Sequence, residues 1–333
     1  MEGIDFGAAL RLELAERNRI YAQGREHVES YGTPPVIVYP ADGERHGNFL
    51  DAAYAAICAR PEWLRRLDKV HAQAARSLPK PPDPHRKWRE LDSSTSSDAL
   101  LMNVFCTPGV VEATAVRRTL GIEGEDSLPM FGWKARVPLK NGRFDRTEVD
   151  MSLGGLLVEA KLTEGDFQNC KVEVVEAYWD FDAVFDRERL PKVEIPVARR
   201  REPAEFPEEY TQEEVRVPAE EWVQTLIEKP RETVTGYASY QLIRNVLAAE
   251  ALGMSFCVIH DARRPDLREA WFAVMAAVRR AELRVRLKVL TWQELTTVLP
   301  EGLREFLDVK YGIVAPGRVA SAAVSGVDGT GKS

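Results

Sequence analysis

One segment of this 333-residue chain constrains its fold more than any other, because it specifies a β-hairpin. In RTEVDMSLGGLLVEAKLTE, residues 146–164, two apolar-rich runs flank Gly154 and Gly155. A pair of glycines can take the positive φ angles of a type I′ or II′ turn, which joins two antiparallel strands through two residues. We therefore predict a tight hairpin centred on these glycines.

The turn also determines which residues face one another across the hairpin. With the two glycines as the loop, Asp150 lies opposite Glu159 and Glu148 lies opposite Lys161. Because side chains alternate between the two faces of a strand, these four charged residues share one face and apolar residues occupy the other. Directly opposed residues have Cβ atoms roughly 4.5–5.5 Å apart, so two carboxylates are expected to meet across the hairpin.

Two interpretations of this charged face are open. A hard cation such as Mg²⁺ between the oxygens of Asp150 and Glu159 would relieve a repulsion that otherwise raises the pKa of one carboxyl. Alternatively, Glu148 pairs with Lys161, and water screens the two acids on an ordinary solvated face. The spacing of the residues is compatible with both.

At these residues the chain resembles the PD-(D/E)XK, or restriction-endonuclease-like, superfamily of nucleases. The pattern is an acid near the end of one strand and E-x-K on its partner, here Asp150 and then Glu159-Ala160-Lys161. The extension K-L-T-E and the later Y-A-S-Y-Q-L-I-R-N are similar to one uncharacterised restriction-endonuclease-like family, over residues 93–310. The proline that gives the motif its first letter is absent.

The resemblance implies a metal-dependent nuclease that hydrolyses DNA phosphodiester bonds. By that resemblance Asp150 and Glu159 would ligate Mg²⁺ or Mn²⁺, and the backbone carbonyl of Ala160 could add a ligand. Lys161 would orient or activate the attacking water. Such a site neutralises the charge that develops on the non-bridging oxygens and needs no nucleophilic side chain.

Two further polar residues are candidates for the same site. Glu112, on the helix expected before the hairpin, could supply the helix acid that many such nucleases add, or it could simply be exposed. Gln241, on the helix after the hairpin, could reach the site or the DNA backbone. Alternatively, it belongs to a polar surface beside an apolar stripe that includes Leu242 and Val246. Trp292 is assigned to the core.

The alternation of elements in the C-terminal part predicts the fold class. We expect a helix at 233–252, a strand at 255–260, a helix at 265–282, a strand at 286–290 and helices up to 309. Strand and helix alternation of this kind implies an α/β layer with some parallel pairing. Together with the resemblance, it predicts a restriction-endonuclease-like core in which helices flank a mixed β-sheet.

A proline-rich stretch, LPKPPDP at 78–84, indicates a boundary near residue 90, because stacked prolines favour an extended chain. Helical periodicity at 7–30 and 48–77, interrupted at Pro61, precedes it. A second helical stretch at 108–121 precedes the hairpin. We predict a helical N-terminal section at 1–90, a nuclease core at 91–313 and a flexible tail at 314–333.

The tail contains a second motif. Gly326 to Ser333 satisfies G-x-x-x-x-G-K-S and resembles the phosphate loop of thymidylate-kinase-like enzymes. A working phosphate loop also needs a following helix whose N-terminus meets the phosphates, and the sequence stops at Ser333. We therefore interpret the tail as an incomplete Walker A-like loop. The alternatives to a nuclease are a non-catalytic member of the same fold that binds nucleic acid or protein, and a remnant of a fusion to a P-loop nucleotide kinase.

Composition argues against several other classes of protein. The net charge of −7 disfavours general affinity for nucleic acid, so DNA would bind at local patches, of which Arg199–Arg201, Arg263-Arg264 and the arginines between 279 and 286 are candidates. The four cysteines and five histidines lack the spacing of a zinc site. Acids and arginines near the start and the lack of a long apolar run predict a cytoplasmic protein without membrane contact. The oligomeric state is open, and a homodimer is compatible with the sequence.

Overall fold

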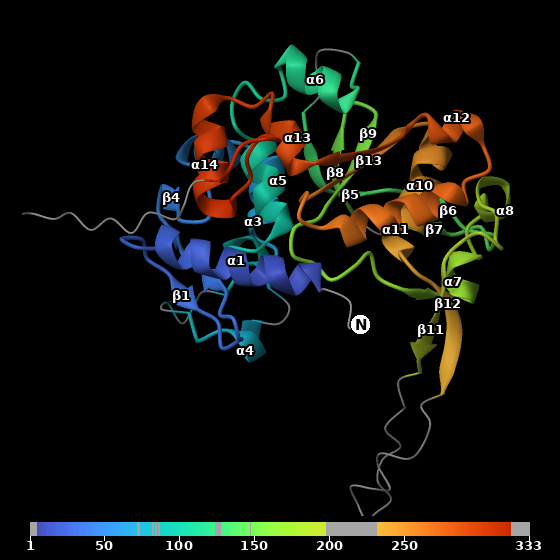
Figure 1. Ribbon diagram of the computed structural model, residues 1–333, viewed down its shortest axis with the longest axis horizontal. Coiled ribbons are helices and arrows are strands. Elements are labelled where there is room, and N and C mark those ends of the chain that lie inside the picture. Colours follow the sequence, from blue (N-terminus) through green and yellow to red (C-terminus); the bar gives the residue numbers. More distant parts are fainter. Residues whose placement is uncertain are drawn as a thin grey trace, which may run out of the picture.

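The computed structural model describes residues 5–71, 74–81, 83, 85, 87–123, 128–146, 148–197 and 232–320. At its centre is a five-stranded mixed sheet with helices on both faces (Figure 1). The predicted α/β class, with a mixed sheet flanked by helices, is confirmed. The predictions for Arg199–Arg201 and for the loop at 326–333 fall outside the described residues.

The central sheet has the strand order β14-β13-β9-β8-β5. Its strands are β5 (Met130–Lys134), β8 (Glu148–Leu153), β9 (Leu156–Ala160), β13 (Ser255–His260) and β14 (Leu287–Thr291). Strand β8 runs antiparallel to both β5 and β9, whereas β9, β13 and β14 run parallel to one another. The antiparallel and parallel halves of the sheet therefore meet at β9, which is buried along its whole length.

The hairpin between β8 and β9 has the predicted turn. Gly154 and Gly155 have φ angles of 51° and 78°, and positive values at both positions are those of a type I′ turn. The pairs Leu153–Leu156 and Met151–Val158 form as counted from the sequence. The turn and its adjacent register are thus confirmed.

Helices cover the two faces of the sheet and bury a separate apolar cluster on each (Figure 1). One face packs against α1 (Phe6–Tyr21), α5 (Ser97–Phe105), α6 (Thr114–Leu120), α13 (Trp292–Thr296) and α14 (Glu301–Tyr311). The other face packs against α10 (Tyr240–Leu252) and α11 (Pro265–Ala276). Alternate residues of β9 enter the two clusters, Val158 on the first face and Leu157 on the second.

The N-terminal section contains short helices and short antiparallel strand pairs. It contains α2 (Asp51–Cys58), α3 (Pro61–Leu67), α4 (Ala74–Ser77), a 3-10 turn at Glu90–Asp92, and the strands β1 (Val28–Glu29), β2 (Ile37–Val38), β3 (Ala41–Asp42) and β4 (Arg45–His46). Leu10 and Leu14 of α1 lie in the same apolar cluster as the sheet. The section therefore packs directly onto the core, and the boundary near residue 90 stays a prediction.

Two helix predictions start too early. The helix expected at 108–121 begins only at Thr114, because Gly109 has a φ of 84° and the residues around it form turns. The helix expected from residue 233 begins at Tyr240. Residues 233–237 form a strand, β12 (Thr233–Tyr237), as their β-branched side chains favour. It pairs with β10 (Cys170–Lys171) and β11 (Lys192–Pro196) in a three-stranded sheet.

The remaining elements are short and lie around this second sheet and the sheet edges. They are α7 (Val172–Val175), α8 (Phe181–Val184), α12 (Ala281–Arg284), β6 (Val137–Pro138) and β7 (Phe144–Asp145). The helix expected from the periodicity at 7–30 is shorter than predicted, since α1 ends at Tyr21. Among the described helices, none combines the length and the apolar character needed to cross a membrane.

Candidate active site

Asp150, Glu159 and Lys161 come together at the C-terminal end of β9. Lys161 Nζ lies 3.0 Å from Glu159 Oε1. Asp150 approaches from β8, and its Oδ2 accepts a hydrogen bond of 2.8 Å from the backbone N–H of Ala160. Glu159 and Lys161 are only 1% and 5% exposed, so this is not the ordinary solvated face that the alternative interpretation supposed.

Two details differ from the counted register. Backbone pairing between β8 and β9 stops at Met151–Val158, and the Asp150 carboxylate bonds to the amide of Ala160 in place of a further rung. Glu148 does not pair with Lys161. Its Oε2 accepts from Arg66 Nη1 of α3 at 2.9 Å. The sequence did not indicate this change of partner, because α3 precedes the hairpin by some eighty residues.

Lys161 is fixed on several sides. Its ammonium donates to Gln241 Oε1 of α10 at 2.9 Å and lies over the ring of Phe167, 5.5 Å from its centroid. Its backbone N–H donates to the carbonyl of Ile259 at 2.9 Å, and its carbonyl accepts from Trp292 Nε1 at 3.0 Å. Gln241 therefore contacts Lys161, and Trp292 lies in the core as expected.

Charge keeps Lys161 protonated. Burial disfavours the ammonium, but the neighbouring carboxylates of Glu159, Glu164 and Asp150 outweigh burial and raise the pKa of Lys161 above its ordinary value. At neutral pH, without a bound cation, the side chain therefore carries a positive charge and donates hydrogen bonds. It can orient a water molecule or contact a phosphate oxygen.

The two oxygens of Glu159 have different surroundings. Oε2 accepts from Asn245 Nδ2 of α10 at 2.8 Å. Oε1 is buried beside Lys161 but has no partner in hydrogen-bond geometry among the described residues. Glu159 thus keeps a buried carboxylate oxygen with free acceptor capacity.

Asp150 sits in an excess of negative charge. Burial and the carboxylates of Glu159 and Asp98 raise the pKa of Asp150 well above its usual range, although Lys161 and the amide of Ala160 oppose the shift. Asp98 is the second residue of α5, and Arg66 binds its carboxylate. The acid that a helix contributes to this site is therefore Asp98.

Glu112 does not occupy the position predicted for it. It lies exposed in the turn before α6 and not on a helix. The error follows from reading residues 108–121 as one helix, which Gly109 prevents.

Three residues of the site were missed from the sequence. Asn245 follows Gln241 by four positions, which places both on one face of α10, so its spacing was a usable signal. Asp98 stands in the first turn of a helix, where an acid stabilises the helix through its dipole. The sequence therefore offered no reason to assign it to the site. Arg66 carried no signal, since only tertiary packing brings α3 to the hairpin.

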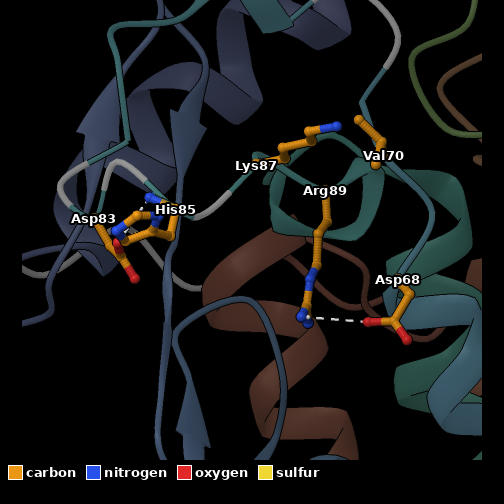
Figure 2. Close-up of a pocket in the computed structure, with 6 residues that line it drawn as sticks. All are labelled: Asp68, Val70, Asp83, His85, Lys87 and Arg89. Atoms are coloured by element: carbon orange, nitrogen blue, oxygen red, sulfur yellow. Dashed lines mark hydrogen bonds and ion pairs between the residues drawn. The ribbon is translucent and has the colours of Figure 1, made fainter.

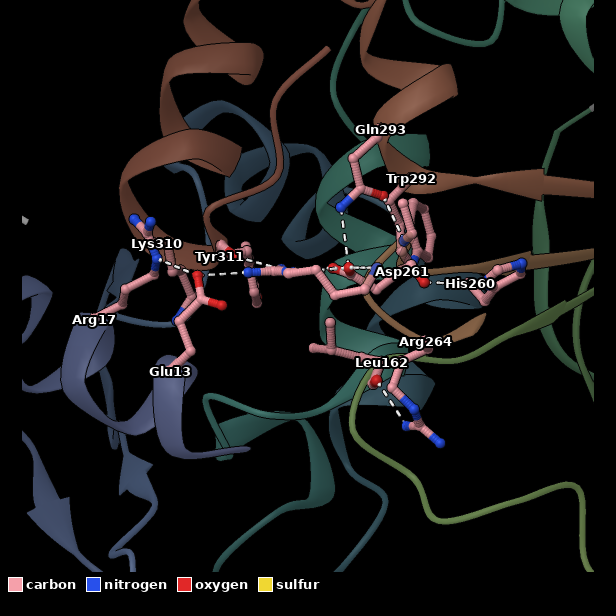
Figure 3. A network of polar contacts seen from close by, with 12 residues as sticks. Glu13, Arg17, Leu162, His260, Asp261, Arg264, Trp292, Gln293, Lys310 and Tyr311 are labelled. Carbon is pink, nitrogen blue, oxygen red and sulfur yellow. Dashed lines mark hydrogen bonds and ion pairs between the residues drawn. The ribbon is translucent and has the colours of Figure 1, made fainter. Parts of the chain in front are cut away.

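A second polar network holds the chain that follows Lys161 (Figure 3). Arg264, which is fully buried, donates to the carbonyls of Leu162, Glu164 and Gly165 at 3.3, 2.6 and 3.0 Å. Arg263 binds Asp261 and reaches Glu13 of α1. Because Arg264 is buried and bonds to three backbone carbonyls, it cannot contribute to the DNA-binding patch predicted at Arg263-Arg264.

The donor set fits a hard divalent cation. Among the described residues no three Asp, Glu, His or Cys side chains converge into a protein-only metal site. Mg²⁺ commonly takes one or two carboxylates and completes its shell with water and substrate phosphate oxygens. Asp150 and Glu159 supply two carboxylates, one of which has a buried oxygen without a hydrogen bond. Their mutual repulsion is the condition that a cation relieves.

The pocket shown in Figure 2 is a separate feature. It is lined by Asp68, Val70, Asp83, His85, Lys87 and Arg89. An ion pair of 3.3 Å joins Arg89 to Asp68 across it. None of the predicted site residues lines it, and its mixture of acids and bases does not favour one class of ligand.

Comparison with known proteins gives one match. Residues 15–312 match a family model described as Restriction Endonuclease associating with ARP. No curated protein and no solved structure matches the chain. The matched range contains the hairpin, α10 and every residue of the cluster described above.

Proposed function

The chain belongs to the family of restriction endonucleases associating with ARP, and on that basis we propose that it is a metal-dependent nuclease that hydrolyses DNA phosphodiester bonds. The observation that carries the proposal is the buried cluster in which Lys161 lies 3.0 Å from Glu159 and Asp150 bonds to the intervening residue. A buried excess of carboxylates destabilises a fold unless something compensates for it. A catalytic cation would provide that compensation.

In this proposal Asp150 and Glu159 hold Mg²⁺ or Mn²⁺, with the carbonyl of Ala160 as a candidate further ligand. The bound cation would neutralise charge on the phosphate and make a coordinated water more acidic. Asn245 holds one oxygen of Glu159 and so orients its carboxylate.

Lys161 acts as a charged donor. Gln241 holds its ammonium, and Glu159 balances its charge. From this position Lys161 donates a hydrogen bond to the attacking water or to a non-bridging phosphate oxygen, where negative charge develops in the transition state. In this role Lys161 takes no proton from the water, so the proton that leaves the water passes to another acceptor, such as bulk solvent or the phosphate itself.

Cleavage of mixed genomic DNA tests the proposal without assuming a recognition sequence. Wild type is incubated with Mg²⁺, with Mn²⁺ or with a chelator, beside Glu159→Gln, Lys161→Met and the exposed control Glu112→Gln. We expect metal-dependent cleavage that falls by about 10²–10³-fold or more in the first two variants, the scale for losing one transition-state contact. The control should retain full activity.

Two results would contradict the proposal. One is cleavage at the wild-type rate by folded Glu159→Gln. The other is a wild type that leaves DNA intact with both cations, which would favour a non-catalytic member of the fold that binds nucleic acid or protein.

A further inference from the structure

An arginine from the N-terminal section lies inside the acid cluster. Arg66 of α3 is 8% exposed. One nitrogen of its guanidinium binds the Asp98 carboxylate, and another donates to Glu148 Oε2 at 2.9 Å. Arg66 thus holds the two carboxylates that flank the Asp150–Glu159 pair.

The sheet is shaped to admit this guanidinium. Gly132 of β5 lies between the paired residues that flank Asp150 in the β5–β8 ladder. It has a φ of 60°, and a Cβ atom at this position would lie 2.6 Å from Arg66 Nη1. A side chain at residue 132 would therefore collide with the arginine. Arg66 Nε is also buried without a hydrogen-bond partner among the described residues.

Carboxylates outnumber cations near the site. Those of Asp98, Glu148, Asp150 and Glu159 lie with only two cations, Arg66 and Lys161, among them. A divalent cation would offset this excess of acids. Without Arg66 the excess would be larger by one charge, and Asp98 and Glu148 would be free to hold another ion.

Resting on the proposed nuclease function, we propose that Arg66 is a positioning residue that takes the place of a second metal ion, so that the site binds one divalent cation and Asp98 does not ligate it. Arginine suits this task because its planar fork is permanently charged and can bind two carboxylates at once. Two-metal sites need carboxylates that bind two ions roughly 3.5–4 Å apart. Here the acids available for a second ion are already occupied.

The test is the number of Mn²⁺ ions bound by the full chain, measured by equilibrium dialysis and by calorimetric titration. Wild type should bind one ion at this site. Arg66→Gln, which removes the charge and leaves Asp98 and Glu148 free, should bind two. Arg65→Gln removes the same charge from an exposed neighbour on α3 and should still bind one.

A double variant keeps the test decisive if Arg66→Gln fails to fold. Arg66→Gln combined with Asp98→Asn removes one positive and one negative charge, which leaves the local charge as in wild type. Because Arg66 and Asp98 become neutral together, the buried Asp98 carboxylate is not left unpaired, and Glu148, which also loses Arg66, has a side chain that is 39% exposed to water. We expect this variant to bind one ion with an affinity within about threefold of wild type, far less than the 10–100-fold loss seen when a group that supports a metal is removed.

The outcomes separate the inference from the proposed function. One ion in folded Arg66→Gln, two ions in wild type, or loss of the ion in the double variant would each overturn the role of Arg66 while leaving a metal-dependent nuclease intact. A wild type that binds no Mn²⁺ would overturn the metal site itself, and with it both proposals.

Discussion

Negative charges are crowded around Asp150 in the candidate site. Asp150 is pressed by two other carboxylates, Glu159 and Asp98, and burial and this repulsion raise the pKa of Asp150. An acid with a raised pKa binds protons more readily in the folded chain than in the unfolded chain. The stability of the metal-free protein should therefore decline as the pH rises above the ordinary range of an aspartate pKa.

A divalent cation should reverse that deficit. A ligand that binds only the folded state adds about 2.7 kcal/mol to the free energy of unfolding at one hundred times its dissociation constant. For a chain of this size the melting temperature should then rise by a few degrees in millimolar Mg²⁺ or Mn²⁺. Glu159→Gln should lose this increment, whereas Glu112→Ala should keep it.

Thermal unfolding followed by circular dichroism measures the shift. The metal-free samples must contain monovalent salt at matched ionic strength, because screening alone relieves part of the repulsion. Equal shifts in wild type and Glu159→Gln would show that the ion binds elsewhere.

The residues that the sequence revealed are those whose relation is local. Asp150, Glu159 and Lys161 are joined by one turn, so their convergence could be computed from two glycines. Asp98 and Arg66 depend on how α5 and α3 pack beside the hairpin, and no spacing within the chain specifies such packing. These two residues could not be predicted because only tertiary contacts bring them to the site.

At the scale of elements, the β8–β9 turn is fixed by its backbone. Gly155 has a φ of 78° and open space around its Cβ position. Gly155→Ala should therefore lower the free energy of unfolding by about 1–2 kcal/mol through backbone strain alone. Gly302→Ala is the matched control. It lies in α14 with no positive φ and equally open surroundings, and should stabilise by about 0.4–1 kcal/mol. Urea unfolding measures both, and a Gly155→Ala variant as stable as wild type would argue against the turn.

The packing of α14 on α1 buries a lysine. Lys310 donates to Asn18 Oδ1 at 3.0 Å and faces the rings of Tyr21, Tyr39 and Tyr311, each centroid within 5.0 Å. Burial lowers the pKa of Lys310 well below its ordinary value, and the charge of Arg25 adds to the effect. The aromatic rings favour the ammonium but recover only part of the lost hydration.

A lysine with a lowered pKa makes stability depend on pH. The folded chain binds fewer protons than the unfolded chain between the lowered pKa and the unfolded value near 10.4, so stability should rise with pH across that window. Lys310→Met should flatten this part of the profile and should be at least as stable as wild type at neutral pH. Urea unfolding from pH 6 to 10 measures this, and an unchanged slope in the variant would locate the titrating group elsewhere.

Element types were predicted better than their limits. The strands at 255–260 and near 286–290 were placed closely, because the first is centred on a continuous apolar run and the second alternates charged and apolar residues before two consecutive apolar ones. The start of α10 was missed because residues 233–237 pair with two strands far away in the sequence, and that pairing decides between strand and helix. The local sequence pattern predicts the type of an element, but the strands with which it pairs determine where it begins.

For the whole molecule, removing the N-terminal section and removing the tail should have different effects on cooperative unfolding. Leu10 and Leu14 lie within the main apolar cluster, and Arg66 lies within the acid cluster. A chain that begins at residue 91 should therefore lose cooperative unfolding. A chain that ends at Ala315 should unfold like wild type, because residues 316–319 are exposed. Calorimetry of the two truncated chains distinguishes these cases. Cooperative unfolding at the wild-type temperature by the chain that begins at residue 91 would show that the N-terminal section is dispensable for the fold.

The position of β9 between β8 and β13 has a consequence for synthesis. A ribosome delivers the whole motif, through Glu164, well before it delivers α10 and β13, which begin at Tyr240 and Ser255. Until then Lys161 lacks the side chain of Gln241 and the carbonyl of Ile259, and Glu159 lacks Asn245. Nascent chains on a polysome therefore carry the acids and the lysine without the residues that arrange them, and they gain these contacts only when α10 and β13 have emerged.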